Sequence, residues 1–87
     1  MNILSPVWDY RDEYYFVQIE NIEINISAYS ESELTLWAYD YKKDEELIDA
    51  YYENMQDLKK SINDLIGARV IVPTLESLLE VTKGEKR

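Results

Sequence analysis

Two runs of alternating apolar and polar residues, joined by one polar pair, constrain the fold of this chain more than any other feature. In "YYFVQIENIEINISAY", residues 14–29, apolar side chains recur at every second position on both sides of Glu20-Asn21. A period of two is typical of β-strands, and Asn21 can adopt the positive φ that a two-residue hairpin requires. Pairing across this turn places six side chains on one face of the hairpin: Tyr15, Val17, Ile19, Ile22, Ile24 and Ile26.

A third strand is predicted in "ELTLWAYDY", residues 33–41, which alternates in the same way. If Ser30-Glu31-Ser32 is a three-residue loop, Leu34, Leu36 and Ala38 join the buried face of the hairpin. Trp37 and Tyr39 then point to the opposite face.

That opposite face carries more aromatic side chains than a solvent-exposed surface usually does. Tyr14, Phe16, Trp37 and Tyr39 lie there together with polar side chains, which are Gln18, Glu23, Asn25 and Ser27. Two arrangements remain open. Either the N-terminal segment or the last helix covers the rings, which is the more common arrangement because large exposed apolar patches are unusual, or the rings form an exposed patch with an acidic rim.

A long amphipathic helix is predicted from about Asp44 to Ile66. Its apolar residues repeat at spacings of three and four, which is the helical period: Ile48, Tyr51, Met55, Leu58, Ile62 and Leu65. Asp44 suits the N-cap, and Gly67 suits the C-terminal stop. Packing of this helix on the sheet predicts a shared core of Ile24, Ile26, Leu36, Met55, Leu58 and Ile62.

The two ends of the chain predict shorter elements. "ARVIV", residues 68–72, indicates a short strand, and Pro73-Thr74 then opens a short helix in "LESLLEV". Residues 2–10 add an edge strand at most, because Pro6 cannot donate to a central ladder.

The predicted fold class is α+β: a small antiparallel meander of three to four strands, packed against one long amphipathic helix, with a short C-terminal strand and helix. We expect a single compact domain over residues 1–82 and a frayed polar tail over residues 83–87.

Composition supports a folded, acidic and disulfide-free domain. The 87 residues include 46% apolar residues, more than a disordered acidic chain carries, and the formal net charge is −9. Residues 1–57 hold fourteen acids and three bases, so the negative charge is concentrated there. The absence of cysteine, of an export signal near Met1 and of any long apolar stretch leads us to expect an intracellular protein with no membrane span.

No catalytic motif is present, and we expect no enzymatic activity. The chain has no histidine and no cysteine, which removes the usual nucleophile–base pairs and the usual zinc ligands. No calcium-binding loop occurs, and the only glycines, Gly67 and Gly84, form no phosphate-binding loop. We therefore predict no catalytic residue, no cofactor and no metal site.

A row of acids lies along the predicted helix. Glu45, Asp49, Glu53 and Asp57 are spaced four apart, which sets them about 6 Å from one another along the helix axis. Phosphates along one DNA strand are about 3.4 Å apart, so the row approaches the charge spacing of DNA within a factor of two. The alternative interpretation is an ordinary solvated face, although such a face more often mixes the two signs of charge.

Acid and aromatic side chains together predict a binding surface. Carboxylates attract a basic partner over long range, while Tyr and Trp supply contact area once the partner is reached. The predicted partner-binding residues are Glu45, Asp49, Glu53, Asp57, Trp37, Tyr39, Tyr14 and Glu23.

Small size, negative charge and aromatic content over the whole chain are similar to those of small proteinaceous inhibitors of nucleic-acid enzymes. That broad class includes phage-borne anti-restriction and anti-CRISPR proteins, nuclease immunity proteins and antitoxins. The likeness implies a cytoplasmic DNA mimic, monomeric or homodimeric, that occupies the basic nucleic-acid-binding surface of a partner protein, in a bacterial host if it is phage-encoded. We expect it to bind neither nucleic acid nor membrane. The alternative is a structural or assembly protein that self-associates through the long helix.

Overall fold

The computed structural model describes residues 2–11 and 13–82, and strands dominate it. A five-stranded antiparallel sheet has the order β2-β3-β4-β5-β6. Its strands are β2 (Asp9–Tyr10), β3 (Tyr15–Ile19), β4 (Ile22–Ser30), β5 (Glu33–Asp40) and β6 (Glu45–Tyr52).

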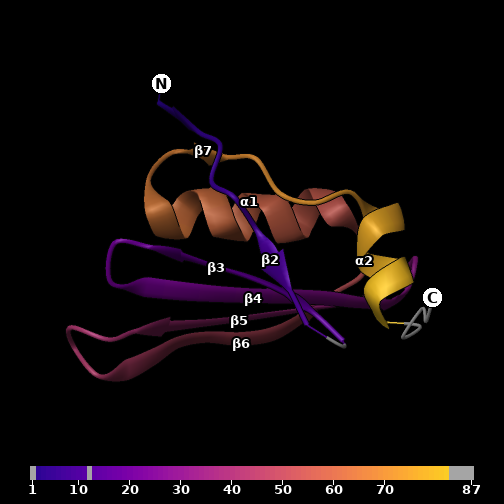
Figure 1. Cartoon of the computed structure of the whole chain (residues 1–87), viewed down its shortest axis with the longest axis horizontal. Helices are drawn as coiled ribbons and strands as arrows, with labels where there is room; N and C mark the ends of the chain where they lie inside the picture. Colours follow the sequence, from indigo (N-terminus) through magenta and orange to yellow (C-terminus); the bar gives the residue numbers. More distant parts are fainter. Residues whose placement is uncertain (1, 12, 83–87) are drawn as a thin grey trace.

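The remaining elements lie over one face of this sheet (Figure 1). They are helix α1 (Met55–Ile66), helix α2 (Leu75–Thr82) and a parallel pair formed by β1 (Ile3–Leu4) and β7 (Arg69–Val70). The molecule therefore has two layers, with the sheet as one layer and α1, α2 and the β1–β7 pair as the other.

The predicted hairpin register is confirmed. Tyr15 pairs with Ile26, Val17 with Ile24 and Ile19 with Ile22. The turn differs in one detail, because Glu20 rather than Asn21 adopts the positive φ of 56°.

The buried face of β5 is also as predicted, although the turn before it is different. Ser30 pairs with Glu33, so the turn has two residues instead of three, and a β-bulge lies between Ala28 and Ser30. The bulge at Tyr29 adds the residue that the shorter turn lacks. Pairing therefore returns to the predicted register, and Leu34, Leu36 and Ala38 are all buried.

The predicted fold class is wrong in its central element, because no long helix runs from Asp44 to Ile66. The first third of that segment is the edge strand β6, and the sheet consequently has five strands instead of three or four. Ile48, Ala50 and Tyr52 pair with residues of β5 that face the core, so this segment follows a period of two. A bulge at Leu47 lets Leu47 and Ile48 both pack against the core.

A turn organised by Asp40 explains why the chain re-enters the sheet. The buried Asp40 carboxylate accepts hydrogen bonds from the backbone N–H groups of Lys42 and Lys43 and from the Asn21 side chain. The N–H of Lys43, followed by the Asn21 amide and the N–H of Lys42, holds the pKa of Asp40 below its ordinary value of 3.8. Asp44 has a positive φ of 56° and closes this turn, so it is not the N-cap of a helix.

The observed helix α1 begins ten residues later than predicted. Asn54 is its N-cap: the side-chain oxygen accepts from the backbone N–H of Asp57 at 2.8 Å, and the Asn54 amide donates to the Asp57 carboxylate at 3.2 Å. Two polar side chains thus stabilise the first turn reciprocally. The predicted C-terminal stop is confirmed, because Gly67 has a φ of 80° and its N–H donates to the carbonyl of Asn63.

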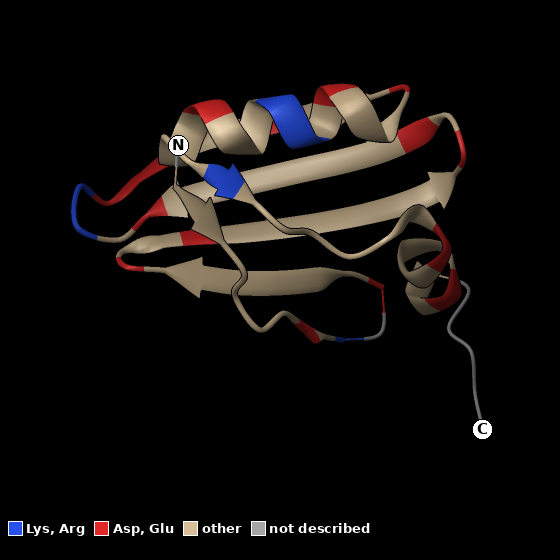
Figure 2. Ribbon diagram, turned by 90° about the horizontal axis from the view of Figure 1, so that it is seen from above, with Lys and Arg blue, Asp and Glu red and all other residues tan. Residues whose placement is uncertain are grey.

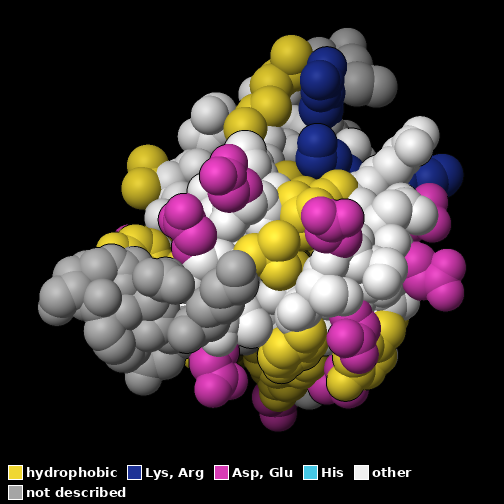
Figure 3. All heavy atoms as spheres, turned by 90° about the vertical axis from the view of Figure 1, so that its right-hand side faces the viewer, with side chains coloured by type: hydrophobic (Ala, Val, Ile, Leu, Met, Phe, Trp, Pro, Cys, Tyr) yellow, Lys and Arg dark blue, Asp and Glu magenta, His cyan; other side chains and the backbone are white. Residues whose placement is uncertain are grey.

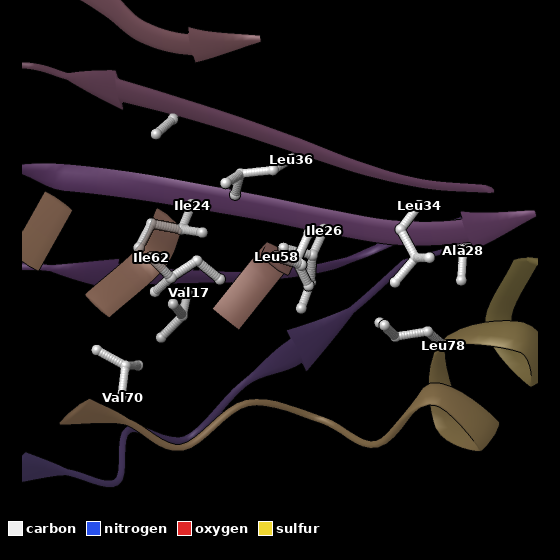
Figure 4. Packing of buried hydrophobic residues seen from close by; sticks show 11 residues of the cluster. Val17, Ile24, Ile26, Ala28, Leu34, Leu36, Leu58, Ile62, Val70 and Leu78 are labelled. Atoms are coloured by element: carbon white, nitrogen blue, oxygen red, sulfur yellow. The ribbon is translucent and has the colours of Figure 1, made fainter. Parts of the chain in front are cut away.

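The core lies between the sheet and the α1/α2 layer (Figure 4). Of the six predicted core residues, Met55 is only partly buried, and the other five are fully buried: Ile24, Ile26, Leu36, Leu58 and Ile62. Leu78 of α2 packs beside Leu34 and Ala28 at one end of the sheet, while Val70 lies near Val17 at the other end (Figure 4).

The N-terminal segment and the last helix both pack on the core side. Trp8 donates its indole N–H to the carbonyl of Ile71 at 2.8 Å, which ties the segment between β1 and β2 to the chain after β7. The short C-terminal strand and helix lie where they were predicted, as β7 and α2. The predicted frayed tail, 83–87, lies outside the described residues.

Truncation of Leu58 tests the shared core. Leu58→Ala should lower the free energy of unfolding by about 2–5 kcal/mol, because a fully buried leucine loses its transfer energy and leaves a cavity. The matched control, Gln56→Ala at an exposed position of the same helix, should change it by less than about 0.5 kcal/mol. Denaturant titration of the three proteins measures both effects. Equal midpoints for all three would contradict the packing of α1 on the sheet.

Substitution of Asn54 distinguishes the observed helix from the long one by the sign of its effect. Asn54→Ala removes an N-cap and should destabilise the protein by about 0.5–2 kcal/mol. In an uninterrupted helix from residue 44 to residue 66, the same change would stabilise, because alanine is the best helix former. Thermal unfolding followed by circular dichroism gives the sign directly.

Candidate functional site

The face of the sheet that points away from α1 carries the densest group of polar and aromatic side chains. The antiparallel register places Phe16, Asn25, Trp37 and Asp49 in one row across four strands. A second row contains Gln18, Glu23, Tyr39 and Glu46. We call this surface, together with Tyr14, Ser27, Tyr29, Thr35 and Tyr51, the outer face.

No helix or strand within residues 2–11 and 13–82 lies over the outer face (Figure 1). Tyr14, Phe16, Trp37 and Tyr39 are partly buried there, whereas Tyr29 and Tyr51 are exposed. Of the two arrangements that the sequence left open, the described part of the chain therefore shows the aromatic patch with an acidic rim.

Three aromatic rings form a ladder along β5 and the turn after it. The rings of Trp37 and Tyr39 stack with centroids 5.6 Å apart and planes 19° apart. Tyr41 continues the ladder, with its centroid 5.0 Å from that of Tyr39. Each partner fixes the orientation of the next ring, so the ladder is a stiff surface of large contact area.

Carboxylates hold the polar end of every ring in this ladder. The Trp37 indole N–H donates to Glu46 Oε2 at 2.7 Å. The phenol of Tyr39 donates to Asp44, and the phenol of Tyr41 donates to Glu23. These hydrogen bonds to carboxylates raise the pKa values of Tyr39 and Tyr41 above the ordinary value of 10.0, because the phenolate form would lose the bond and face a negative charge.

A second aromatic row lies at the start of β3 and just before it, on the far side of β4 from the ladder. Tyr14 and Phe16 have their ring centroids 6.0 Å apart. The guanidinium carbon of Arg11 lies 4.9 Å from the centroid of Phe16, which is a cation–π contact. This contact shows that the outer face accommodates a planar cation.

A hollow of about 200 Å³ lies between the two aromatic rows. Tyr14, Tyr29 and Trp37 contribute aromatic rings to its lining, and Glu13, Asn25 and Thr35 contribute polar groups. Ser27 also lines it, and its hydroxyl is hydrogen-bonded to that of Thr35.

Five of the eight predicted partner-binding residues lie together on the outer face: Trp37, Tyr39, Tyr14, Glu23 and Asp49. The predicted acidic row is wrong, because its members belong to different elements. Glu45 and Asp49 are on β6, Glu53 is in the turn after it, and Asp57 is in the first turn of α1. Asp49 reaches the outer face because it pairs with Trp37, whereas Glu45 pairs with Asp40 at the end of the sheet.

Three contributors were not predicted as site residues: Glu46, Asp44 and Tyr41. Asp44 and Glu46 follow from the presence of β6, since the β5–β6 turn brings Asp44 back to Tyr39 and the strand brings Glu46 back to Trp37. Tyr41 could have been found from the sequence, because it extends the alternation of Trp37 and Tyr39 by one step.

The charges are distributed unevenly. Acidic residues recur in the turns at both ends of the sheet and also lie on α1 and α2, while basic residues lie after β2 (Arg11), in the β5–β6 turn, on α1 and at β7 (Figure 2). In Figure 3, aromatic and apolar side chains stand among acidic ones in the lower part of the view, and Lys and Arg side chains lie in the upper part. The outer face itself carries the carboxylates of Glu23, Glu46 and Asp49, together with the Arg11 guanidinium over Phe16.

The described part of the chain contains neither a group of side chains arranged for a metal ion nor a helix that could span a membrane. Among residues 2–11 and 13–82, no group of three or more acidic side chains is arranged to hold a metal ion. Neither α1 nor α2, the helices found there, is long and apolar enough to cross a membrane. A further hollow beside Gly67 is lined by Asn63, Asp64, Ala68 and Arg69 and contains no aromatic ring.

Comparison of the chain with protein-family models, with curated proteins and with solved structures found no match. The outer face is therefore the feature of the molecule from which a function can be inferred.

Removal of the carboxylates should lower the two raised tyrosine pKa values. Asp44→Asn should lower the pKa of Tyr39 towards 10.0, and Glu23→Gln should do the same for Tyr41. The stability that these bonds contribute is present below pH 10 and is lost as the pH rises through the higher folded-state pKa values. Ultraviolet absorbance titration of phenolate formation measures the change. Titration curves identical to the wild type would contradict the two hydrogen bonds.

Proposed function

We propose that this chain is a protein-binding module whose outer face binds a basic surface of another protein. The observation that carries the proposal is the pairing of each ladder ring with a carboxylate: Trp37 with Glu46, Tyr39 with Asp44 and Tyr41 with Glu23. Aromatic rings with few torsions lose little entropy on binding and dominate binding hot spots. Carboxylates among them favour a partner of opposite charge.

The partner class we propose is a nucleic-acid-binding protein. Its groove for phosphates is basic, so it is complementary to a molecule of net charge −9. Aromatic sheet faces also stack nucleic-acid bases in other proteins, but the carboxylates of Glu23, Glu46 and Asp49 would repel the phosphates. Occupation of the groove would exclude nucleic acid, so the module would act as an inhibitor, in the cytoplasm and, if it is phage-encoded, in that of a bacterial host.

The alternative, self-association through a long helix, is not supported, because the long helix that it requires is absent from the described residues. Helix α1 has twelve residues, and its apolar residues Leu58 and Ile62 are buried against the sheet. Acid spacing along a helix likewise no longer supports DNA mimicry. The support that remains is the combination of charge and aromatic area on the outer face.

Charge reversal on the outer face tests the proposal against a variant of equal net charge. The test variant carries Glu23→Lys and Asp49→Lys, and the control carries Glu76→Lys and Glu80→Lys, two exposed positions of α2. Each protein is immobilised and used to capture partners from a bacterial lysate. Partners retained by the wild type and the control should be retained at least about tenfold less by the test variant.

A competition step identifies the surface of the partner. Double-stranded DNA or RNA added to the loaded wild-type matrix should release the captured protein, because the module and the nucleic acid would occupy the same groove. Equal retention by the test and control variants would contradict the role of the outer face. Retention that persists in the presence of excess DNA and excess RNA would contradict the occupation of a nucleic-acid groove.

A further inference from the structure

We propose that the hollow between the two aromatic rows is a receptor for one arginine side chain of the bound partner. The inference rests on the proposed function and adds the chemical identity of the partner side chain that the hollow binds. It predicts that the contact depends on a guanidinium group and not on positive charge alone.

The lining of the hollow suits a planar cation. Three aromatic residues from different strand regions line the hollow, Tyr14, Tyr29 and Trp37, and a guanidinium can stack on aromatic rings. Tyr29 is 53% exposed, so this ring is available to a ligand. Tyr29 lies at the bulge of β4, and bulges commonly occur next to sites, where they reorient side chains.

Polar groups of the hollow match the donors of arginine. Three of the lining residues, Glu13, Asn25 and Thr35, have side-chain oxygens that can accept a hydrogen bond. A guanidinium has five N–H donors in a fixed fork, whereas a lysine ammonium is a compact point charge that gains less from flat rings. None of the residues that line the hollow is basic, although the Arg11 guanidinium lies over the adjacent Phe16 ring.

The protein already binds a guanidinium on the same face. Arg11 lies over the Phe16 ring at 4.9 Å, and the Phe16 ring packs against that of Tyr14, which lines the hollow. The hollow thus continues an aromatic row that carries a guanidinium of its own. This intramolecular contact shows that a guanidinium can lie on the aromatic row.

Titration of the full chain with small capped amino acids tests the inference directly. The probes are Nα-acetyl-arginine amide, the lysine equivalent and the citrulline equivalent, which has the shape of arginine without its charge. Binding is followed by the backbone amide signals of the protein in nuclear magnetic resonance spectra. Arginine should shift the signals of Asn25, Ser27 and Trp37 in a saturable way, and should bind at least about fivefold more tightly than lysine or citrulline.

Two variants should weaken binding of arginine, and one should not. Trp37→Leu and Tyr29→Ala each remove a ring of the hollow and should each raise the dissociation constant by about fivefold or more. Tyr10→Ala is the matched control, because Tyr10 is 67% exposed and its ring packs against Tyr15 instead of the hollow. Amide spectra also report whether each variant is folded. If Trp37→Leu does not fold, Tyr29→Ala still provides the test.

Failure of this inference can be distinguished from failure of the proposed function. If citrulline or lysine binds as tightly as arginine, or if arginine shifts no signals around the hollow, the inference is wrong. Partner capture that is still lost in the Glu23/Asp49 charge-reversal variant would then leave the proposed function standing. Conversely, arginine binding with unchanged capture by that variant would support the receptor and contradict the proposed function.

Discussion

The antiparallel register of β3, β4 and β5 determines both faces of the sheet at once. Because successive side chains of a strand point to opposite faces, burial of Ile24, Ile26 and Leu36 against the helices obliges Asn25 and Trp37 to face the other way. A shift by one residue would bury Trp37 and expose Leu36. The register that buries the apolar core therefore also determines which aromatic and acidic side chains share the outer face.

The hairpin could be predicted from the sequence because its determinants are local. Alternation on both sides of Glu20-Asn21 leaves one register that collects every aliphatic side chain on one face. The segment after Asp40 could not be predicted in this way, since Ile48 fits two patterns. It is followed by Tyr51 and Met55 at helical spacing and by Ala50 and Tyr52 at strand spacing.

Polar contacts at the two ends of β6 decide between those patterns. The Asp40 carboxylate accepts three hydrogen bonds in the turn before the strand, and Asn54 caps a helix after it. Such side-chain bonds to the backbone set element boundaries but leave little trace in hydrophobic periodicity.

The same reason limits the prediction of the site. The carboxylates of Glu46 and Asp44 reach the aromatic ladder only because the chain turns back at Asp40, whereas Trp37, Tyr39 and Glu23 follow from the hairpin register alone.

The acids of β6 also affect how the sheet ends. Strand β6 has eight residues and lies at the edge of the sheet, so its outward backbone groups have no strand neighbour within the described chain. An edge of that length is a template for pairing with a second copy, and native proteins discourage such pairing with charge. Glu45, Glu46 and Asp49 give the edge one sign of charge, so two copies side by side would repel each other. A basic partner would gain from the same charges. One set of carboxylates thus opposes self-association and favours a partner of opposite charge, which makes the acidity of this strand consistent with a module that binds a different protein.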